Sequence, residues 1–239
     1  MRIVYHGHSC IQVTHDAVSV IIDPFLTGNP LAISKDLEQI KAQYILLTHG
    51  HSDHITDAIP LAKQNHAPII AVEELAVHLG RHGAQVEPMH VGGAWDFPFG
   101  RVFLTPALHT SSALSEDGQI VYTGSPVGII LQIDGITLYH AGDTGLFGDM
   151  RLIGERFDID IAFLPIGGRF TMGPEDAAIA ASWIKARRVI PIHYNTFPGI
   201  KQDASLFVQM LLQKGIAGQV LEPGEQLVIH SGKPKEMPL

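Results

Sequence analysis

Short apolar segments recur along the chain between polar and glycine-containing turns, and this pattern predicts many strands. Most of these segments are rich in Val, Ile and Leu, which suit a pleated and buried backbone. Gly135 follows Asp134 between two of them, which predicts the tip of a tight hairpin. The predicted strands are Ile3–Tyr5, Ile11–Thr14, Val18–Ile22, Tyr44–Thr48, Ile69–Val72, Val102–Thr105, Val127–Ile133, Ile136–Tyr139, Ile161–Leu164, Val189–Ile192 and Gln226–Ile229.

Helical signals lie between the strands, more densely in the second half of the chain. Pro174 starts one such segment, and Asp203 is a plausible N-cap of another, with Gly215 as its stop. No Ser-, Pro- or Gly-rich linker divides the sequence, so we expect one α/β domain over residues 1–239, with two sheets between helical layers. The predicted helices are Thr56–Asn65, Glu73–His82, Pro174–Arg187 and Asp203–Lys214.

Composition and charge narrow the range of functions. The chain is 46% hydrophobic and 17% charged, as globular proteins are, and runs such as Val127–Leu131 are too short to span a bilayer. The first residues lack the apolar core of a signal peptide, and Cys10 is the only cysteine, so we expect a soluble cytoplasmic protein. A net charge of −8 argues against binding to nucleic acid.

The run His49-Gly50-His51-Ser52-Asp53-His54 carries the strongest chemical signal in the sequence. It places three imidazoles and a carboxylate directly after the apolar segment that begins at Tyr44. These groups are ligands for zinc and similar divalent ions, and no packing requirement asks for four of them in one turn. The alternative is a polar turn with surface histidines. The density of ligands favours a metal site.

Other potential ligands also follow predicted strands. His109, Asp143 and His193 each come after an apolar segment. Catalytic groups in α/β sheets gather at the carboxyl ends of strands, so these side chains can meet on one edge. A lone histidine after a strand is by default a hydrogen-bonded structural residue, but several such positions together with the histidine run favour a shared metal site.

The chain resembles the metallo-β-lactamase-fold superfamily. The resemblance rests on Ile22-Asp23-Pro24, the histidine run, Ala107-Leu108-His109-Thr110, His140-Ala141-Gly142-Asp143-Thr144 and Pro191-Ile192-His193-Tyr194, in that order. It implies a four-layer αββα sandwich with the metal site at one edge of the two sheets. The segments Tyr5–Ser9, Arg169–Pro174 and His193–Pro198 further resemble prokaryotic metal-dependent hydrolases close to the ascorbate-phosphate-lactonase-like branch, for which the resemblance brings no established substrate.

The resemblance also implies a ligand set for two metal ions. His49, His51 and His109 would hold one ion, and Asp53, His54 and His193 the other, with Asp143 bridging both. Mixed nitrogen and oxygen donors suit zinc, which we expect, but also manganese, iron and cobalt. Ions with an open position would supply a bridging hydroxide that attacks a carbonyl or phosphorus, and Asp53 and Asp143 would be the catalytic carboxylates.

Several further residues are expected to support this site. We expect Asp23 and His140 to orient ligands, although packing is an equal alternative for His140. His6 and His8 lack a following Asp-His pair, which favours a hydrogen-bonding or structural role. Arg169 could pair with an anionic substrate or be an ordinary surface arginine. The stretch Ser111–Pro126 could form a lid or a solvated loop. No motif assigns a role to His15, His66, His78, His82, His90 or His230.

Three classes of function therefore stand. We expect a hydrolase of a small ester, lactone or phosphodiester, with no membrane or nucleic-acid partner. An RNA-processing metallo-nuclease is disfavoured by the acidic net charge and the lack of a basic arm. A non-hydrolytic metal-binding or di-iron redox protein is disfavoured by the full ligand set and the lack of an appended flavin domain. Related proteins are often homo-oligomers, but the resemblance does not fix the oligomeric state of this protein.

Overall fold

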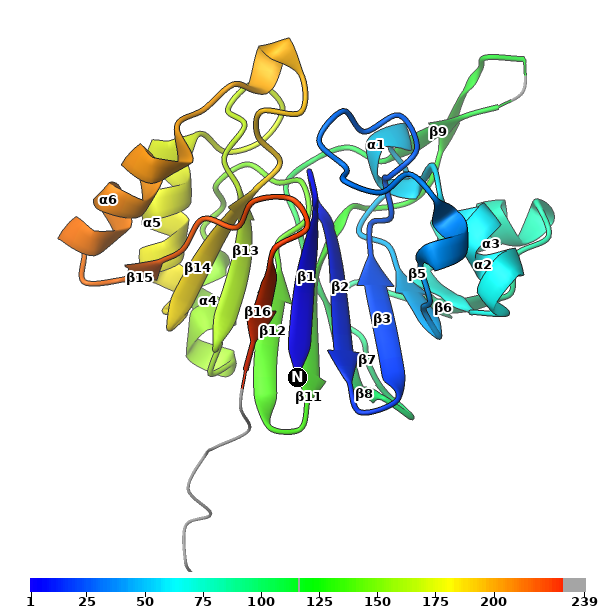
Figure 1. Cartoon of the computed structure of the whole chain (residues 1–239), viewed down its shortest axis with the longest axis horizontal. Helices are drawn as coiled ribbons and strands as arrows, with labels where there is room; N and C mark the ends of the chain where they lie inside the picture. The colour runs from blue at the N-terminus through cyan, green and yellow to red at the C-terminus, as the bar shows by residue number, and fades with distance from the viewer. Residues whose placement is uncertain (116, 230–239) are drawn as a thin grey trace, which may run out of the picture.

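The computed structural model describes residues 1–115 and 117–229, and two seven-stranded sheets form its centre (Figure 1). In the first sheet the strand order is β16-β1-β2-β3-β4-β5-β6. Its strands β1 to β3 pair antiparallel, whereas β3 to β6 run parallel. The bounds are β1 Arg2–Gly7, β2 Cys10–His15, β3 Val18–Ile22, β4 Tyr44–Leu46, β5 Ile69–Val72, β6 Val86–Met89 and β16 Gln226–Val228.

The second sheet has the order β15-β14-β13-β12-β11-β8-β7. Strands β11 and β12 form the hairpin that the sequence predicts, and both Asp134 and Gly135 at its tip have positive φ, 49° and 74°. Two positive φ values are what the tightest hairpin turn requires. The bounds are β7 Ala94–Phe97, β8 Gly100–Pro106, β11 Val127–Ile133, β12 Ile136–His140, β13 Ile161–Pro165, β14 Arg188–Ile192 and β15 Ala217–Gly218.

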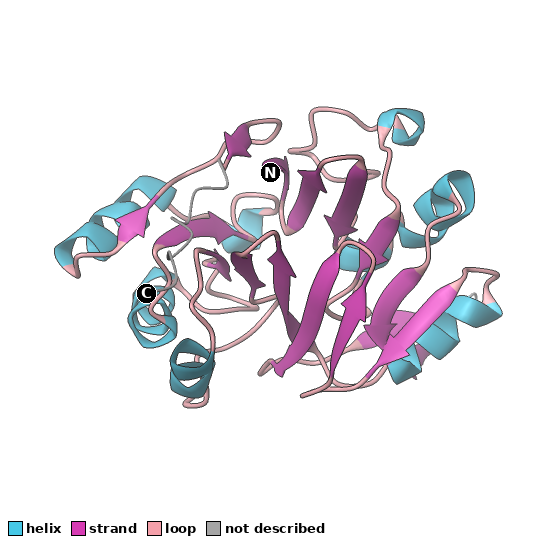
Figure 2. Ribbon diagram, turned by 90° about the horizontal axis from the view of Figure 1, so that it is seen from below, coloured by secondary structure: helices cyan, strands magenta, loops and turns pink. Residues whose placement is uncertain are grey.

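Helices cover the outer face of each sheet (Figures 1 and 2). Helices α2 (Ala58–Asn65) and α3 (Glu73–Arg81) pack on the first sheet, and α4 (Met150–Arg156), α5 (Pro174–Ile184) and α6 (Ala204–Gln213) pack on the second. Short helices are α1 (Ser52–Ile55), η1 (Leu37–Gln39) and η2 (Pro198–Ile200). Among the residues that the structure describes, no helix has the length and apolarity of a membrane span.

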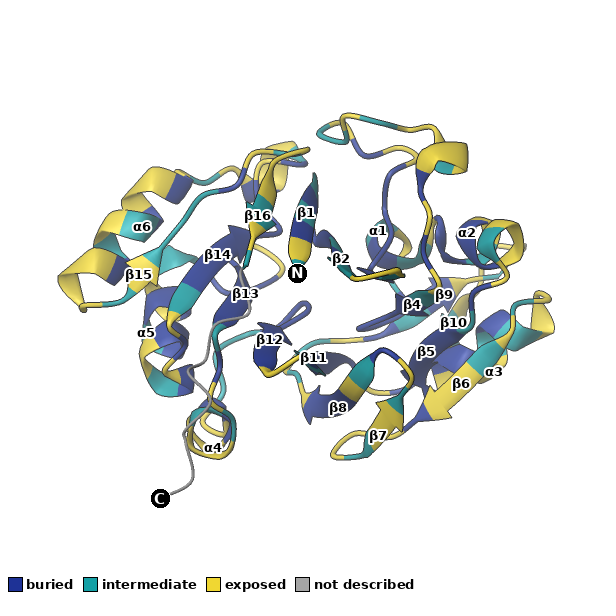
Figure 3. Cartoon of the chain, turned by 60° about the horizontal axis from the view of Figure 1, so that its bottom comes forward, coloured by how far each residue is buried: buried dark blue, intermediate teal, exposed yellow. Residues whose placement is uncertain are grey.

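Three apolar clusters fill the spaces between these layers. One lies between the two sheets and joins residues from both, for example Tyr5 and Ile22 with Ile129 and Phe163. The other two lie between each sheet and its helices, and Figure 3 shows the buried faces turned inward. This four-layer arrangement confirms the predicted αββα sandwich, which requires each sheet to bury both of its faces.

Several predicted boundaries were wrong for local reasons. The helix predicted as Pro174–Arg187 ends at Ile184, because Lys185 adopts a left-handed backbone with φ 54°. The helix predicted from Thr56 begins at Ala58, and Thr56 instead ends α1.

The stretch Ser111–Pro126, predicted as either a lid or a solvated loop, contains the hairpin of β9 (Ser112–Leu114) and β10 (Ile120–Tyr122). Figure 1 shows the hairpin projecting beyond the sheets. Helix α4 and the edge strands β6 and β7 were also missed, since they are too short to show a clear period.

Candidate metal centre

The predicted ligands all lie at the carboxyl ends of strands that run in one direction. The histidine run follows β4 in the first sheet, whereas His109, Asp143 and His193 follow β8, β12 and β14 in the second. Strands β8 and β12 both pair antiparallel with β11, and β12 to β14 are parallel, so their ends meet on one edge. This edge is the one that carries α1 in Figure 1.

The first group of donors is His49, His51 and His109. His49 Nε2 lies 2.9 Å from His51 Nδ1, and His109 Nε2 lies 3.3 Å from the same atom. Two nitrogens that bind one tetrahedral zinc at 2.0–2.1 Å are separated by about 3.3 Å, so the spacing suits a shared ion. His49 is fully buried, whereas the side chain of His109 remains 13% exposed, which leaves one side of the group open.

The second group of donors is Asp53, His54 and His193, joined by His8. His193 Nε2 lies 3.8 Å from Asp53 Oδ2, and the ligand atoms of all four residues lie within 4.8 Å of one another. His54 and His193 are buried, but the Asp53 side chain is 28% exposed. Both groups therefore have a buried side and a side open to solvent.

Asp143 lies between the two groups. Its Oδ2 is 2.9 Å from His193 Nε2, 3.7 Å from His109 Nε2 and 4.0 Å from His49 Nε2. Its Oδ1 is 3.4 Å from His54 Nε2. One carboxylate thus faces donors of both groups, which is the position that a bridging ligand needs.

Buried polar atoms without partners test whether this donor set fits a metal. Among the described residues, His54 Nε2, Asp143 Oδ1 and both ring nitrogens of His193 are buried and make no hydrogen bond of good geometry. Such atoms are costly to bury unless something else satisfies them. Because they converge with histidine nitrogens on one small region, divalent cations are the group that they fit.

The electrostatics of the cluster also favour a cation. Burial alone would raise the pKa of Asp143, but His193 and His54 outweigh burial and hold it well below its usual range. Burial would lower the pKa of His54, yet Asp143 and Asp23 outweigh it and raise that pKa well above the usual value. The buried carboxylates thus attract positive charge strongly, whether a proton or a metal ion supplies it.

Asp23 supports both groups from below, as expected from the sequence. Its Oδ2 accepts from His54 Nδ1 at 2.8 Å and from Thr48 Oγ1 at 2.7 Å. Because the Thr48 hydroxyl donates its proton to Asp23, its oxygen can only accept a hydrogen bond from His49 Nδ1, 3.0 Å away. In the neutral form that binds a metal, both histidines therefore carry the lone pair on Nε2, the atom that faces the cluster.

His140 acts on the backbone rather than on a ligand side chain. Its Nε2 donates to the Ser9 carbonyl at 2.9 Å, and its Nδ1 accepts from the Gly142 N–H at 3.2 Å. It therefore fixes the turn that leads to Asp143 and ties this turn to the N-terminal loop. His140 thus has a packing role and also orients Asp143 indirectly, the two alternatives that the sequence leaves open.

His8 lies closer to the centre than the sequence suggests. It is fully buried, and burial together with His193 lowers its pKa to about 4, so the ring is neutral. Its Nε2 lies 3.2 Å from Asp53 Oδ2, and Nδ1 lies 2.8 Å from Thr196 Oγ1. Since a carboxylate only accepts, Nε2 carries the proton and holds Asp53 in place.

Left-handed backbone is concentrated around the centre. His8, Asp23, His193 and Asn195 have φ values between 48° and 59°, a region that residues other than glycine seldom adopt. A hydrogen bond of 2.8 Å from His193 N to His8 O ties two of these residues together. Strained positions held by their surroundings are typical of functional sites.

Arg169, predicted either to pair with an anionic substrate or to be an ordinary surface residue, lies beside an aromatic ring. It is exposed, and its guanidinium lies 5.3 Å from the ring centroid of Phe170. His6 hydrogen-bonds to Gln12 Oε1 at 2.9 Å, which is the structural role expected for it. His230 lies outside the described residues.

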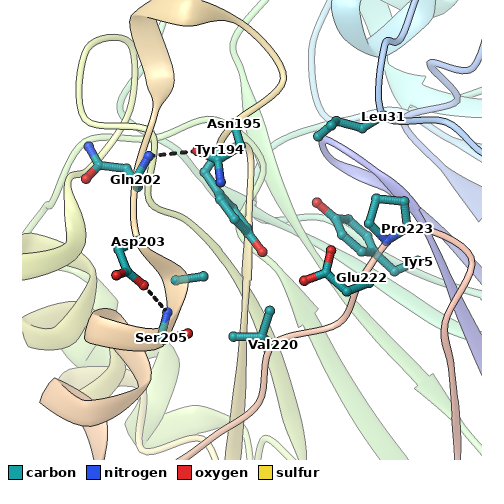
Figure 4. Close-up of a pocket in the computed structure, with 11 residues that line it drawn as sticks. Tyr5, Leu31, Tyr194, Asn195, Gln202, Asp203, Ser205, Val220, Glu222 and Pro223 are labelled. Carbon is teal, nitrogen blue, oxygen red and sulfur yellow. Dashed lines mark hydrogen bonds between the residues drawn. The ribbon is translucent and has the colours of Figure 1, made fainter.

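Two cavities flank the centre. One, of about 490 Å³, is lined by His51 and Asp53 and opens from the exposed side of the cluster. The other, of about 420 Å³, lies on the far side of Tyr194, where Tyr5 and Glu222 face the same space (Figure 4). None of the predicted ligands is among the residues that line this second cavity, so the first one is the route to the centre.

Comparisons with known proteins give the family. The sequence profile of the beta-lactamase superfamily domain matches residues 16–194. A UPF0173 metal-dependent hydrolase of Geobacillus sp. is 56% identical over 225 residues, 94% of this chain and 98% of that relative. One from Bacillus subtilis is 53% identical over 228 residues, 95% of this chain and 99% of that relative.

A solved structure agrees with these relatives. Igni18, a metallo hydrolase from the archaeon Ignicoccus hospitalis, matches with a TM-score of 0.86 at 37% identity and covers 95% of this chain and 97% of its own. The αββα sandwich, the histidine and aspartate cluster at the strand ends and these similarities agree. The chain belongs to the metallo-β-lactamase superfamily, in the family of UPF0173 metal-dependent hydrolases.

Proposed function

We propose that the protein hydrolyses a small ester, lactone or phosphodiester at a pair of divalent metal ions, with zinc as the foremost choice. One observation carries the proposal: the Asp143 carboxylate lies between two groups of histidine nitrogens, 2.9 Å from His193 and 4.0 Å from His49. An arrangement with one shared carboxylate supports two ions rather than one.

His49, His51 and His109 would hold the first ion, and Asp53, His54 and His193 the second, with Asp143 shared. When bound, such ions lower the pKa of water enough to supply hydroxide at neutral pH and stabilise negative charge on the substrate. Asp23 and Thr48 keep the lone pairs of His49 and His54 turned inward.

Asp53 is the carboxylate that can orient the attacking water. His8 fixes its Oδ2 at 3.2 Å, and the remaining part of the side chain is open to the cavity. Although burial would raise the pKa of Asp53, the hydrogen bond from His8 and the charge of His54 lower it. Asp53 is therefore ionised at neutral pH and accepts a hydrogen bond from water, which positions that water for attack.

Metal removal and reloading test the proposal. The protein is stripped with a chelator, reloaded with zinc, manganese, iron or cobalt, and assayed on p-nitrophenyl acetate, a simple lactone, bis(p-nitrophenyl) phosphate and single-stranded RNA. We expect hydrolysis of a small-molecule substrate only after reloading, and saturation at about two equivalents of metal. Full activity of metal-free protein, or cleavage of RNA alone, would overturn the proposal.

A further inference from the structure

A groove leads from the open side of the metal centre to the surface. Its volume is about 490 Å³, within the range of small-molecule sites. It begins at His51 and Asp53, two predicted ligands, and is lined by α1, α3 and β9. A substrate held at the centre would therefore extend into this groove.

Apolar side chains line three sides of the groove, between polar residues. Ile55 and Ile59 line one side, Leu79 of α3 another, and Ala113 and Leu114 of β9 a third. The polar lining outside the centre consists of serine, threonine and histidine side chains, and no lysine or arginine lines the described groove. Such walls gain free energy by burying carbon and offer no fixed positive charge for a phosphate.

Two histidines on α3 complete the lining. The rings of His78 and His82 are 4.8 Å apart, and His82 Nδ1 donates to the His78 carbonyl at 2.9 Å. Burial, followed by the charges of His82 and Arg81, lowers the pKa of His78, so its ring is neutral at pH 7. The His78 ring can therefore exchange hydrogen bonds with a polar group of a substrate.

We propose that this groove, from His51 to His82, binds the acyl chain of an ester, lactone or thioester, and that acyl substrates long enough to fill it are preferred over phosphodiesters. The inference rests on the proposed hydrolysis and makes it more specific. The groove is continuous with the centre, so a scissile carbonyl beside Asp53 would place an attached chain against Ile55, Ile59 and Leu114.

A series of p-nitrophenyl esters tests the groove. For the metal-loaded protein, we expect kcat/KM to rise from acetate through butyrate and hexanoate to octanoate, by about fourfold for each buried methylene, until the groove is filled. Bis(p-nitrophenyl) phosphate should be slower than the octanoate ester. A flat or falling ester series, or faster cleavage of the phosphodiester, would overturn the inference.

Two matched leucine variants locate the chain. Leu114 in the groove and Leu212 on α6 are exposed to similar extents, 71% and 73%, so neither substitution should prevent folding. Leu114→Asp should lower the octanoate-to-acetate ratio of kcat/KM by about tenfold, because it removes the burial of one or two methylenes. Leu212→Asp should leave the ratio unchanged. Equal ratios in both variants would contradict the assignment.

Direct binding separates this inference from the proposed function. Calorimetry measures octanamide, an uncharged and poorly hydrolysed probe, against acetamide on the wild type and both leucine variants. Preferential binding of octanamide that Leu114→Asp weakens supports the groove even if no ester is cleaved, and only the hydrolase proposal then fails. Ester hydrolysis without octanamide binding overturns the groove alone.

Discussion

Asp23 lies beneath the metal centre and links its two ligand groups. It contacts His54 directly and His49 through Thr48, and its own backbone has the unfavourable φ of 48°. The surrounding structure stabilises this strained conformation, in which one carboxylate contacts His54 directly and His49 through Thr48. At the level of single residues, Asp23 and Thr48 therefore orient the rings of His49 and His54 so that Nε2 of each faces the centre.

Asp143→Asn tests the shared carboxylate. The amide keeps the shape but removes the charge between the two groups, so metal affinity should fall by more than the roughly 10- to 100-fold typical of a residue that only supports a ligand. Metal content after dialysis measures the loss. Asp134→Asn is the control, since Asn also tolerates the left-handed backbone of this hairpin tip. Wild-type metal content in Asp143→Asn would refute the role.

Cys10 should be chemically inert in the folded protein. It is fully buried, and burial raises the pKa of its thiol far above the usual value, an effect that a backbone hydrogen bond of Phe25 only partly offsets. Since the thiolate is the reactive form, we expect negligible labelling by a thiol reagent at pH 8 in buffer and one label per chain in denaturant. Rapid labelling of native protein would contradict this burial.

At the level of elements, the loops after the strands hold the candidate metal ligands. The sequence predicted some residues of this site and not others. Strands β11 and β12 and the ligands that follow β4, β8, β12 and β14 were predictable, because each combines an apolar run with a local polar signal. The proximity of His8 to the centre was not predictable. It depends on Asp53, 45 residues away, and on Thr196, 188 residues away, which no local pattern reports.

The β9–β10 hairpin was also not predictable from the local sequence. Its strands have only three residues each, too few to show a strand period, yet the base of the hairpin is fixed to the histidine run by a hydrogen bond of 3.1 Å from Gly50 N to Ser111 Oγ. Tertiary contacts of this kind override weak local propensity.

Gly142→Ala tests the turn between β12 and Asp143. Gly142 has φ 63°, and a Cβ there would lie 2.8 Å from Val127 O and 2.9 Å from Thr48 Cβ. We expect the free energy of unfolding to fall by about 2–4 kcal/mol, from backbone strain and overpacking, in urea titrations. Gly148→Ala, where a Cβ meets nothing within 4 Å, should change stability by less than about 0.5 kcal/mol. Equal stability of the two variants would contradict the crowded turn.

At the level of the whole molecule, the two sheets share both the core and the metal centre. Residues of both sheets form the central apolar cluster, for example Leu46 with Leu104. The histidine run comes from the first sheet, and His109, Asp143 and His193 come from the second. The edge where the sheets meet is thus the only place where all predicted ligands can converge.

This shared core leads us to propose that residues 1–229 unfold as one cooperative domain. Calorimetry of the metal-free protein should show a single transition whose calorimetric and van't Hoff enthalpies agree. Two separable transitions, one for each sheet with its helices, would show that the sheets are independent domains.

The most direct test of the central claim is anomalous diffraction at the zinc edge from crystals of reloaded protein. We predict two peaks separated by about 3.5–4 Å, one beside His49, His51 and His109 and the other beside Asp53, His54 and His193, with Asp143 between them. A single peak, or peaks away from these side chains, would contradict the two-metal account.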